Sequence, residues 1–199
     1  MSKWADAQIW EKAWWNNCAN TFGEEMKQLL YASRMGLVQT PDANTPYRFD
    51  MQGKSILDIG GGPTSLLLKC VNFKKVKVID PLKFPFWIKK RYESAGIEFQ
   101  QIKAEKIKEK GWDEIFIYNT LQHTDNVEQV IKNIKKAGKI IRLFEWLDTP
   151  VNIGHPQCLT EKNLNRWLGG KGRVDEVKGQ NNCWGRAFYG IFIGKKEKV

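Results

Sequence analysis

The sequence predicts an α/β fold in which a parallel sheet is covered by helices on both faces. From residue 54 onward, short segments rich in β-branched residues alternate with helical segments, which is the order of strands joined by crossover helices. Before residue 50, aromatic and aliphatic side chains recur at helical spacing instead. At 199 residues the chain is expected to be one domain, with residues 1–50 as an N-terminal helical cap and residues 51–199 as the core.

The N-terminal part is expected to contain two helices. Residues 3–36 lack proline and contain one internal glycine, Gly23, so the break is placed near residues 20–23, and a loop with two prolines follows over residues 38–50. The expected strands are 55–59, 76–80, 97–102, 114–118, 139–144, 173–177 and 187–194, the last two paired across a loop at 179–185. The helices between them are expected at 64–72, 85–95, 125–137 and 160–168, the last beginning with the start signal Thr160 and Glu161.

Composition narrows the class of protein. A hydrophobic content of 42% argues against disorder. No apolar run approaches the roughly 18 residues that a membrane helix needs. The first residues lack the apolar segment of a secretion signal, so a cytoplasmic protein without membrane contact is expected. The four cysteines lie far apart with no CxxC pair, which predicts neither a zinc site nor a redox dithiol, and no metal site is expected.

The formal charge of +10 has two interpretations. It would favour an anionic partner, such as an anionic small molecule, nucleic acid or a lipid surface. Much of the excess, however, lies in dispersed lysine pairs such as residues 74–75 and 135–136, which suit solvated helix faces and loops. The sequence carries no signal of the oligomeric state.

A glycine loop follows the first expected strand, in 55-SILDIGGGPTSLLLKC-70. Glycines there let backbone amides approach a ligand closely, although a tight turn without a ligand would also use them. The dinucleotide pattern GxGxxG would need glycine where Ser65 stands, and the phosphate loop GxxxxGK(S/T) is absent. Asp58 stands two residues before Gly60, where a carboxylate repels a pyrophosphate and attracts a cation. The loop therefore predicts a ligand with positive charge.

The segment LDIGGGP resembles the first motif of the class I S-adenosylmethionine-dependent methyltransferases. The resemblance extends over residues 53–148, with a looser echo at 155–168. The ligand of that family carries an ammonium and a sulfonium, which accounts for the carboxylate of Asp58. The resemblance implies a seven-stranded Rossmann-like sheet in the order 3-2-1-4-5-7-6, with strand 7 antiparallel and the ligand at the carboxyl ends of the strands.

The same resemblance implies a set of cofactor-binding residues. Asp80, at the end of the second strand, is similar to the acidic residue that accepts hydrogen bonds from both ribose hydroxyls, because a carboxylate offers two oxygens to a diol. Ala104 and Glu105 would lie near the adenine, and Asn119 and Leu121 near the methionine part. The residues expected to bind S-adenosylmethionine and its product S-adenosylhomocysteine are Asp58, Gly60, Gly61, Gly62, Pro63, Asp80, Pro81, Ala104, Glu105, Asn119 and Leu121.

Two histidines are candidates for a catalytic base. In the family, a histidine soon after the fourth strand lies near the transferred methyl group, where a neutral imidazole can remove a proton from an attacking OH or NH. His123 stands at that position, although it could equally cap or pack the following helix. His155, on the loop after the fifth strand, is the second candidate.

Three further residues are candidates for the substrate side. Glu145 and Asp148 leave the fifth strand and would hold a cationic or hydroxylated substrate. Trp14 belongs with Trp10 and Trp15 to a tryptophan-rich cap, which either packs as core or forms a lid over the cofactor.

The resemblance implies transfer of a methyl group to an O or N atom of a small molecule, a displacement at carbon that needs positioning and sometimes a base, but no metal. A nucleic-acid substrate is the competing interpretation, supported by the charge. However, residues 119–122 read NTLQ, not the Asp/Asn-Pro-Pro-Tyr/Phe of enzymes that methylate base amines. A non-catalytic module that binds S-adenosylmethionine is a third alternative. A nicotinamide-dependent reductase is disfavoured by Asp58 and Ser65.

Overall fold

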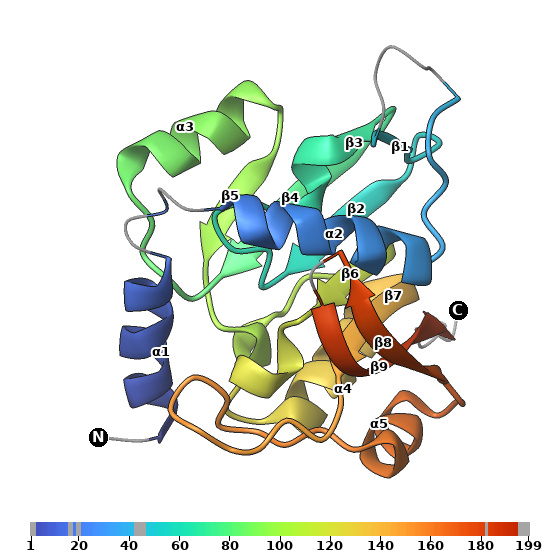
Figure 1. Ribbon diagram of the computed structural model, residues 1–199. Coiled ribbons are helices and arrows are strands. Elements are labelled where there is room, and N and C mark those ends of the chain that lie inside the picture. The colour runs from blue at the N-terminus through green and yellow to red at the C-terminus, as the bar shows by residue number, and fades with distance from the viewer. Residues whose placement is uncertain (1–2, 16–17, 19–20, 42–46, 182, 195–199) are drawn as a thin grey trace.

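In the computed structural model, which describes residues 3–15, 18, 21–41, 47–181 and 183–194, seven strands form one sheet in the order β5-β4-β2-β6-β7-β9-β8 (Figure 1). All neighbours are parallel except β9, which is antiparallel to both β7 and β8. Counted along the chain within this sheet, the order is 3-2-1-4-5-7-6 with the seventh strand antiparallel, so the predicted topology is confirmed. The strands are β2 Ser55–Ile59, β4 Lys75–Asp80, β5 Glu98–Gln101, β6 Trp112–Tyr118, β7 Gly138–Trp146, β8 Arg173–Gln180 and β9 Cys183–Ile193.

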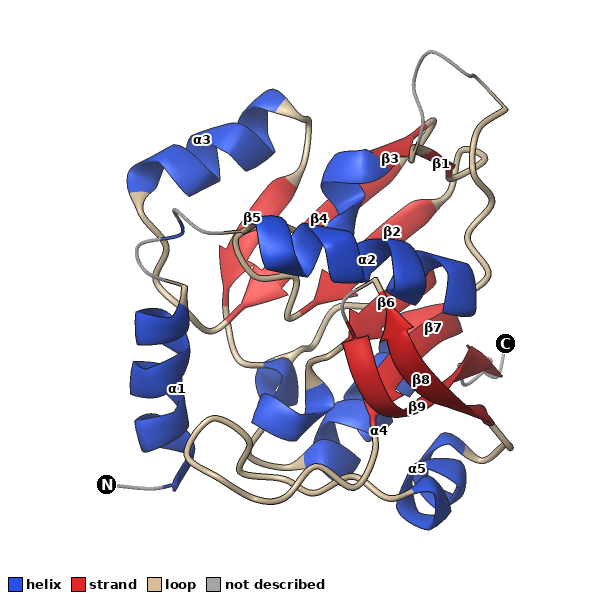
Figure 2. Cartoon of the chain, viewed as in Figure 1, coloured by secondary structure: helices blue, strands red, loops and turns tan. Residues whose placement is uncertain are grey.

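Helices cover both faces of this sheet (Figure 2). On one face, α2 (Phe22–Arg34) and α3 (Phe86–Ser94) pack in a core that includes Ile56 of β2. On the other face, α4 (Val127–Ala137) and α5 (Glu161–Leu168) pack in a core that includes Leu57 and Ile59. Successive side chains of a strand point to opposite faces, so one central strand supplies both cores and reads as a continuous apolar run. No helix in the described ranges is both long enough and apolar enough to cross a bilayer.

The helix predicted over residues 64–72 is wrong. The Ser65 hydroxyl accepts a hydrogen bond from the Leu67 amide and starts a single 3-10 turn, η2 (Leu66–Lys69). The chain then extends into β3 (Cys70–Val71), which pairs in parallel with β1 (Phe49–Asp50) in a small second sheet. Asn72 follows with a φ of 53°, in the left-handed region that ends a helix. Gln28 of α2 donates to the Thr64 carbonyl, so α2 contacts the start of this segment.

The two predicted N-terminal helices are present as α1 (Lys3–Trp14) and α2, but the break between them lies earlier than the predicted residues 20–23, because α1 ends at Trp14 and α2 already contains Phe22 and Gly23. Residues 16–17 and 19–20 lie outside the described ranges. The predicted loop over 179–185 is shorter than expected, because β8 continues to Gln180 and β9 begins at Cys183. Asn181, with a φ of 49°, lies in the turn, and residue 182 lies outside the described ranges. Two further single 3-10 turns follow β5 and β6, namely η3 (Ala104–Lys106) and η4 (Leu121–His123).

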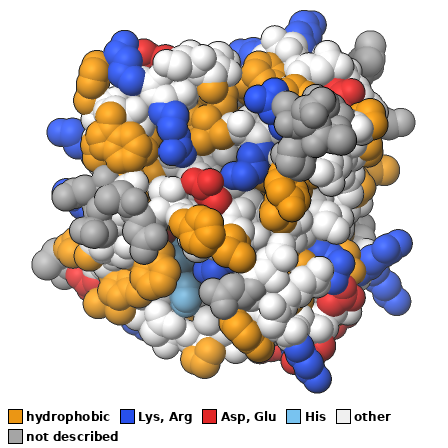
Figure 3. Space-filling model, turned by 45° about the horizontal axis from the view of Figure 1, so that its top comes forward, with side chains coloured by type: hydrophobic (Ala, Val, Ile, Leu, Met, Phe, Trp, Pro, Cys, Tyr) orange, Lys and Arg blue, Asp and Glu red, His pale blue; other side chains and the backbone are white. Residues whose placement is uncertain are grey.

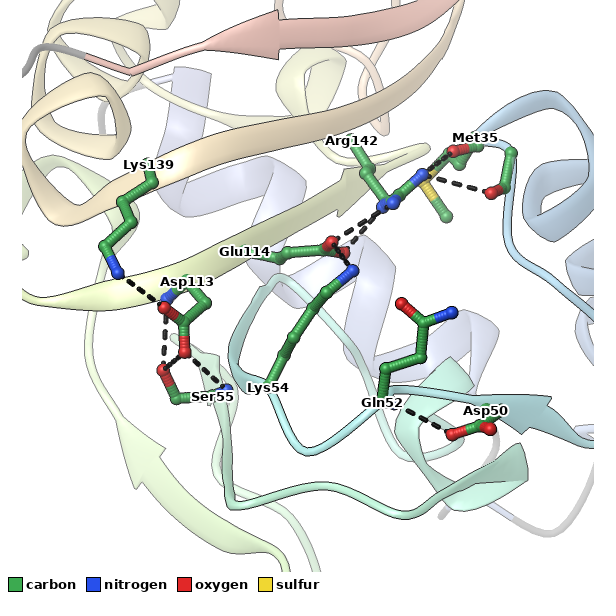
Figure 4. Close-up of polar contacts among 10 residues, drawn as sticks. Met35, Asp50, Gln52, Lys54, Ser55, Asp113, Glu114, Lys139 and Arg142 are labelled. Carbon is green, nitrogen blue, oxygen red and sulfur yellow. Dashed lines mark hydrogen bonds and ion pairs between the residues drawn. The ribbon is translucent and has the colours of Figure 1, made fainter.

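Ion pairs tie the amino ends of the central strands together (Figure 4). Glu114 accepts from Lys54 Nζ at 2.8 Å and from Arg142 Nε at 2.6 Å, which links the segment before β2 to β6 and β7. Asp113 pairs with Lys139 Nζ at 2.7 Å. This network lies at one edge of the sheet. The opposite edge, where the parallel strands end, is where open parallel sheets bind ligands.

Candidate functional site

A cavity of about 500 Å³ lies at the carboxyl ends of β2, β4 and β6. The glycine loop after β2, the end of β4 and the turn after β6 line one side, and α1 and α2 line the other. The predicted site residues that line it are Gly60, Gly61, Gly62, Asp80, Pro81, Ala104, Glu105, Asn119, His123, His155 and Trp14. Five predicted residues, all of them described, lie outside the lining: Asp58, Pro63, Leu121, Glu145 and Asp148.

Side chains of the protein itself pack so closely against this loop that only glycine fits at its three positions. Gly60 has a φ of 70°, and a Cβ there would lie 2.4 Å from Thr120 Cγ2. A Cβ on Gly61 would lie 2.6 Å from Asp58 Oδ2. Gly62, with a φ of 64°, lies against the Trp15 ring, which a Cβ would approach to 3.3 Å. The loop is therefore packed closely from below by Asp58 and Thr120, and its other side forms part of the cavity.

Asp58 supports this loop from inside the core. Its Oδ2 accepts hydrogen bonds from the Ser65 hydroxyl at 2.5 Å and from the Tyr118 hydroxyl at 2.8 Å. Burial raises the pKa of the Asp58 carboxyl to about 7. Tyr92 adds a second support, because its hydroxyl donates to the Gly62 carbonyl at 2.6 Å. The sequence reasoning missed both tyrosines, since the only signal was a polar tip on residues that otherwise read as core.

Asp80 ends β4 at the cavity. Its Oδ2 accepts from the Gly62 amide at 3.1 Å and its Oδ1 from the Leu82 amide at 2.8 Å, so it orients the glycine loop as well as facing the site. Burial raises the pKa of the Asp80 carboxyl to about 7. Ile79, Leu82 and Ile102 line the cavity beside it and make this part of the wall apolar.

The remaining residues predicted around the cofactor differ in what they contact. Glu105 accepts from the Asp125 and Asn126 amides at the start of α4 while also lining the cavity. Asn119 has a φ of 49°, and its side-chain oxygen accepts from Gln122 Nε2 at 2.9 Å. Leu121 is fully buried in the core under α4. The Pro63 carbonyl accepts from Arg91 Nη2.

The ring of His123 is held in one orientation at the cavity. Its Nδ1 lies 2.7 Å from the Gly154 carbonyl and 3.2 Å from Glu11 Oε2. A proton on Nδ1 donates to the Gly154 carbonyl, which leaves Nε2 as an acceptor, 3.5 Å from Gln122 Nε2. Burial lowers the pKa of His123, so the ring is neutral near pH 7.

Glu11 is a cavity residue that the sequence reasoning missed. Its Oε1 accepts from Trp15 Nε1 at 3.1 Å, and its Oε2 is buried without a hydrogen-bond partner. Burial raises the pKa of the Glu11 carboxyl to about 7. The signal was its place one helical turn before Trp15 on the face of α1 that also carries Trp4.

His155 lies beside His123, with 4.8 Å between the ring centroids. Its Nδ1 lies 3.2 Å from Asn152 Nδ2, and burial lowers its pKa to about 4. Both candidate bases are therefore brought together at one end of the cavity, and both are neutral near pH 7.

The two acidic residues predicted to hold a substrate bind other groups of the protein and do not line the cavity. Glu145 is fully buried and accepts from the amides of Thr120 and Leu121, and burial raises its pKa to about 8. Its carboxyl group therefore holds the turn after β6 and does not line the cavity. Asp148 is exposed and pairs with Arg186.

The three tryptophans of the predicted cap, Trp10, Trp14 and Trp15, all line the cavity, but they differ in burial, because Trp15 packs in the core while Trp14 does not. Trp14 is 57% exposed and stacks on Trp10 at 5.6 Å between centroids. Within α1 only Ala7 is buried, so the helix does not pack as core. In Figure 3, hydrophobic side chains border the pale blue of a histidine on the surface.

Among the described residues, no three His, Cys, Asp or Glu side chains are grouped in a way that could hold a metal ion.

Comparisons with known proteins identify the fold. No family model matches the sequence, and no curated protein matches it. The DhpI-SAH complex is similar in structure, with a TM-score of 0.65, 16% identity, and coverage of 97% of this chain and 98% of that one. The complex between the Haloferax volcanii Trm112 methyltransferase activator and the putative methyltransferase gives a TM-score of 0.65 at 8% identity, covering 96% and 98%. A SAM dependent methyltransferase from Aquifex aeolicus gives 0.52 at 19% identity, covering 86% and 98%.

Proposed function

We propose that this chain, which has the fold of the class I S-adenosylmethionine-dependent methyltransferases, binds S-adenosylmethionine and transfers its methyl group to an O or N atom of a small molecule. One observation supports this most. The glycine loop, Asp80, Ala104 and Asn119, each from the end of a different strand, line a single cavity. This is the set of strand ends that the motif order predicted.

The residues present fit this cofactor. Each oxygen of Asp80 accepts one backbone amide, and a carboxylate oxygen can accept a second hydrogen bond, so both oxygens remain able to bind the ribose diol. The apolar wall of Ile79, Leu82 and Ile102 beside Asp80 suits an adenine ring. The cofactor supplies an electrophilic methyl group on a positively charged sulfur.

The chain's own residues orient the acceptor, exclude water and move a proton. His123 presents Nε2 as a proton acceptor, because the Gly154 carbonyl holds the proton on Nδ1. The α1 tryptophans cover the cavity and keep water from it. A nucleic-acid acceptor is less well supported, because a base would have to pass beneath α1. A non-catalytic module would keep the cofactor contacts but show no turnover.

Calorimetric titration tests the proposal. We expect S-adenosylhomocysteine to bind, and Asp80→Ala to weaken its binding by about 1.5–3 kcal/mol through the loss of charge-assisted hydrogen bonds. Asp175→Ala, on β8 and away from the cavity, is the matched control and should leave the affinity unchanged. Binding of NAD in place of S-adenosylmethionine and its product would show that the proposal is wrong, and an unchanged affinity in Asp80→Ala would remove Asp80 from the site.

A further inference from the structure

Indole rings dominate the walls of the cavity. Six of the nine tryptophans in the chain line it, namely Trp4, Trp10, Trp14, Trp15, Trp146 and Trp184. Trp14 and Trp184 are 57% and 67% exposed, which is unusual for so large an apolar side chain. The face of an indole attracts cations. Lys103 already uses it in this way, with its ammonium 3.1 Å from the centroid of the Trp4 ring.

The unpartnered polar atoms of the cavity can all accept hydrogen bonds. Among its described lining residues, the buried side-chain atoms without a partner are Gln8 Oε1, Glu11 Oε2, Gln122 Oε1 and the Tyr31 hydroxyl. Gln122 is 2% exposed, and its Nε2 already donates to Asn119, so the group left without a partner is its oxygen. A buried acceptor left without a donor costs about 1–3 kcal/mol. The cavity therefore suits a ligand that brings N–H or O–H donors.

The cavity is acidic although the whole chain carries +10. Among the described lining residues, four are acidic and two are lysines: Glu11, Glu24, Asp80, Glu105, Lys27 and Lys103. Lys27 forms an ion pair with Glu24, with 2.9 Å between Nζ and Oε1. Burial is the main cause that raises the pKa values of Glu11 and Asp80. Glu24 raises that of Glu11 further, and Glu11 that of Asp80. Carboxylates that oppose each other's ionisation are relieved by a cation placed between them.

We propose that the methyl acceptor is an amine, which enters as an ammonium ion and is held in an acceptor chamber formed by Trp10, Glu11, Gln122, His123 and His155. This rests on the proposed function, because it names the acceptor of that transfer. The members are joined by direct contacts: Glu11 Oε2 lies 3.2 Å from His123 Nδ1, and the Trp10 ring 6.4 Å from that of His155. The donors of an ammonium match the free oxygens of Glu11 and Gln122, and the indole face suits its charge.

The chemistry of transfer to an amine balances with the groups present. The bound ammonium gives one proton to His123 Nε2, which frees the nitrogen lone pair. That lone pair forms the new N–C bond to the methyl carbon while the C–S bond breaks and its electron pair stays on sulfur. The products are a methylated ammonium ion, a neutral thioether and a protonated His123, which returns its proton to water. An anionic acceptor, which the net charge had suggested, would instead face the unpaired oxygen of Glu11.

Calorimetry with three benzyl probes tests the charge preference on protein saturated with S-adenosylhomocysteine at pH 7.5. We expect benzylamine to bind about tenfold or more tightly than benzyl alcohol, and benzoate not to bind. Equal or tighter binding of benzoate or benzyl alcohol would overturn the proposal. Displacement of S-adenosylhomocysteine by benzylamine would overturn it too, since the free acceptors would then serve the ammonium of the cofactor. If S-adenosylhomocysteine itself fails to bind, the proposed function fails, and benzylamine binding to the free protein still tests the chamber.

The same titration distinguishes a free amine from an amine carried by a peptide. Nα-acetyl-lysine methylamide presents the same ammonium on a peptide backbone. Tighter binding of this probe than of benzylamine would assign the chamber to a lysine side chain, and weaker binding to a free amine. Both outcomes retain an amine as the acceptor, whereas failure of both amines to bind would contradict it.

Variants then assign the binding to the chamber. Glu11→Gln and Trp10→Leu should each weaken benzylamine binding by about 5- to 30-fold and change benzyl alcohol binding much less, because the first removes a charge without changing the shape of the side chain and the second replaces a π face with an apolar side chain. Trp87→Leu is the matched control, since Trp87 is a half-exposed tryptophan of α3 that does not line the cavity. Unchanged S-adenosylhomocysteine affinity shows that each variant is folded. Retained benzylamine affinity in both chamber variants would place the amine elsewhere.

Discussion

At the scale of single residues, the proposed role of His123 as a base depends on the Gly154 carbonyl. It accepts the Nδ1 proton at 2.7 Å, and the neutral ring then offers Nε2 as a base. We expect His123→Ala to lower the rate of S-adenosylhomocysteine formation by about 10²–10⁴. Cofactor affinity should stay unchanged, because His123 supports no part of the glycine loop. Full turnover in this variant, with a loss in His155→Ala, would transfer the role to His155.

Two glycine substitutions separate the cost of a steric clash from the cost of a positive φ. Gly60→Ala should destabilise the fold by about 2–4 kcal/mol, since it adds a clash with Thr120 to the cost of a positive φ. Gly96→Ala is the control, because Gly96 has a φ of 71° with nothing within 4 Å of an added Cβ. It should cost only about 1 kcal/mol. Urea denaturation of both variants measures the difference, and equal losses would mean that Thr120 moves aside.

At the scale of elements, α1 lies against the cavity and is held there by a few side-chain contacts. Its contacts with the rest of the molecule include Trp10 against Gly154, Trp4 against the Lys103 ammonium, and Glu11 near His123. Few buried apolar contacts hold it, so it belongs to the part of the fold that opens most readily.

Gly154→Ala tests this attachment. An added Cβ would lie 2.6 Å from the Trp10 ring, so we expect α1 to detach more often and trypsin to cut after Lys12 several times faster at an unchanged melting temperature. Gly23→Ala serves as control, because a Cβ on Gly23 has nothing within 4 Å. A digestion rate equal to that of the control would mean that the Trp10 contact does not hold α1.

The element that follows the glycine loop shows where local patterns fail. The run 64-TSLLLKC-70 has the leucine content of a helix, yet it makes one 3-10 turn and a short strand. α2 contacts this segment through Gln28, which lies 36 residues before Thr64 in the sequence and donates to its carbonyl. A contact of that range leaves no periodicity in the segment itself.

At the scale of the whole molecule, buried carboxyls determine how stability depends on pH. Burial raises the pKa values of Asp58 and Asp80 to about 7 and that of Glu145 to about 8. These groups bind protons in the folded state at a pH where the unfolded chain has lost them. Their contribution to stability is therefore complete below about pH 4, the ordinary range of such groups, and is lost as the pH rises through 7 to 8.

We expect the free energy of unfolding to fall between pH 5 and 8, by up to about 1.4 kcal/mol per pH unit for each such group. Glu145→Gln should reduce this slope, because glutamine keeps an oxygen for the Thr120 and Leu121 amides and does not ionise. Glu128→Gln, on α4, is the control. Urea denaturation across this range measures the slope, and an unchanged slope in Glu145→Gln would show that Glu145 is ionised in the folded protein.

Asp113 acts in the opposite direction. Hydrogen bonds from Lys139 and Ser55 hold its pKa below the ordinary range, so its contribution is lost as the pH falls below about 4. The protein therefore loses the contribution of the Asp113 ion pair in acid, and it loses the contribution of the buried acids above neutrality.

The sequence by itself determined the sheet. Apolar strands of about five residues, alternating with helices, specify a parallel sheet buried on both faces, because the spacing of side chains along a segment records how that segment is covered. The same reasoning placed the glycine loop, Asp80, Ala104 and Asn119 at strand ends, and strand ends of a parallel sheet must meet at one edge.

Only the tertiary structure decided what fills the space around those strand ends. Glu145 is buried and binds the turn after β6. Glu11 and Gln122 line the cavity, and Tyr92 and Tyr118 support the glycine loop directly or through Asp58. These outcomes depend on where α1 and α2 lie relative to the strand ends, and both helices precede the first strand of the seven-stranded sheet in the sequence. Periodicity describes one segment at a time, whereas the direction of a polar side chain is set by whichever distant segment offers it a partner.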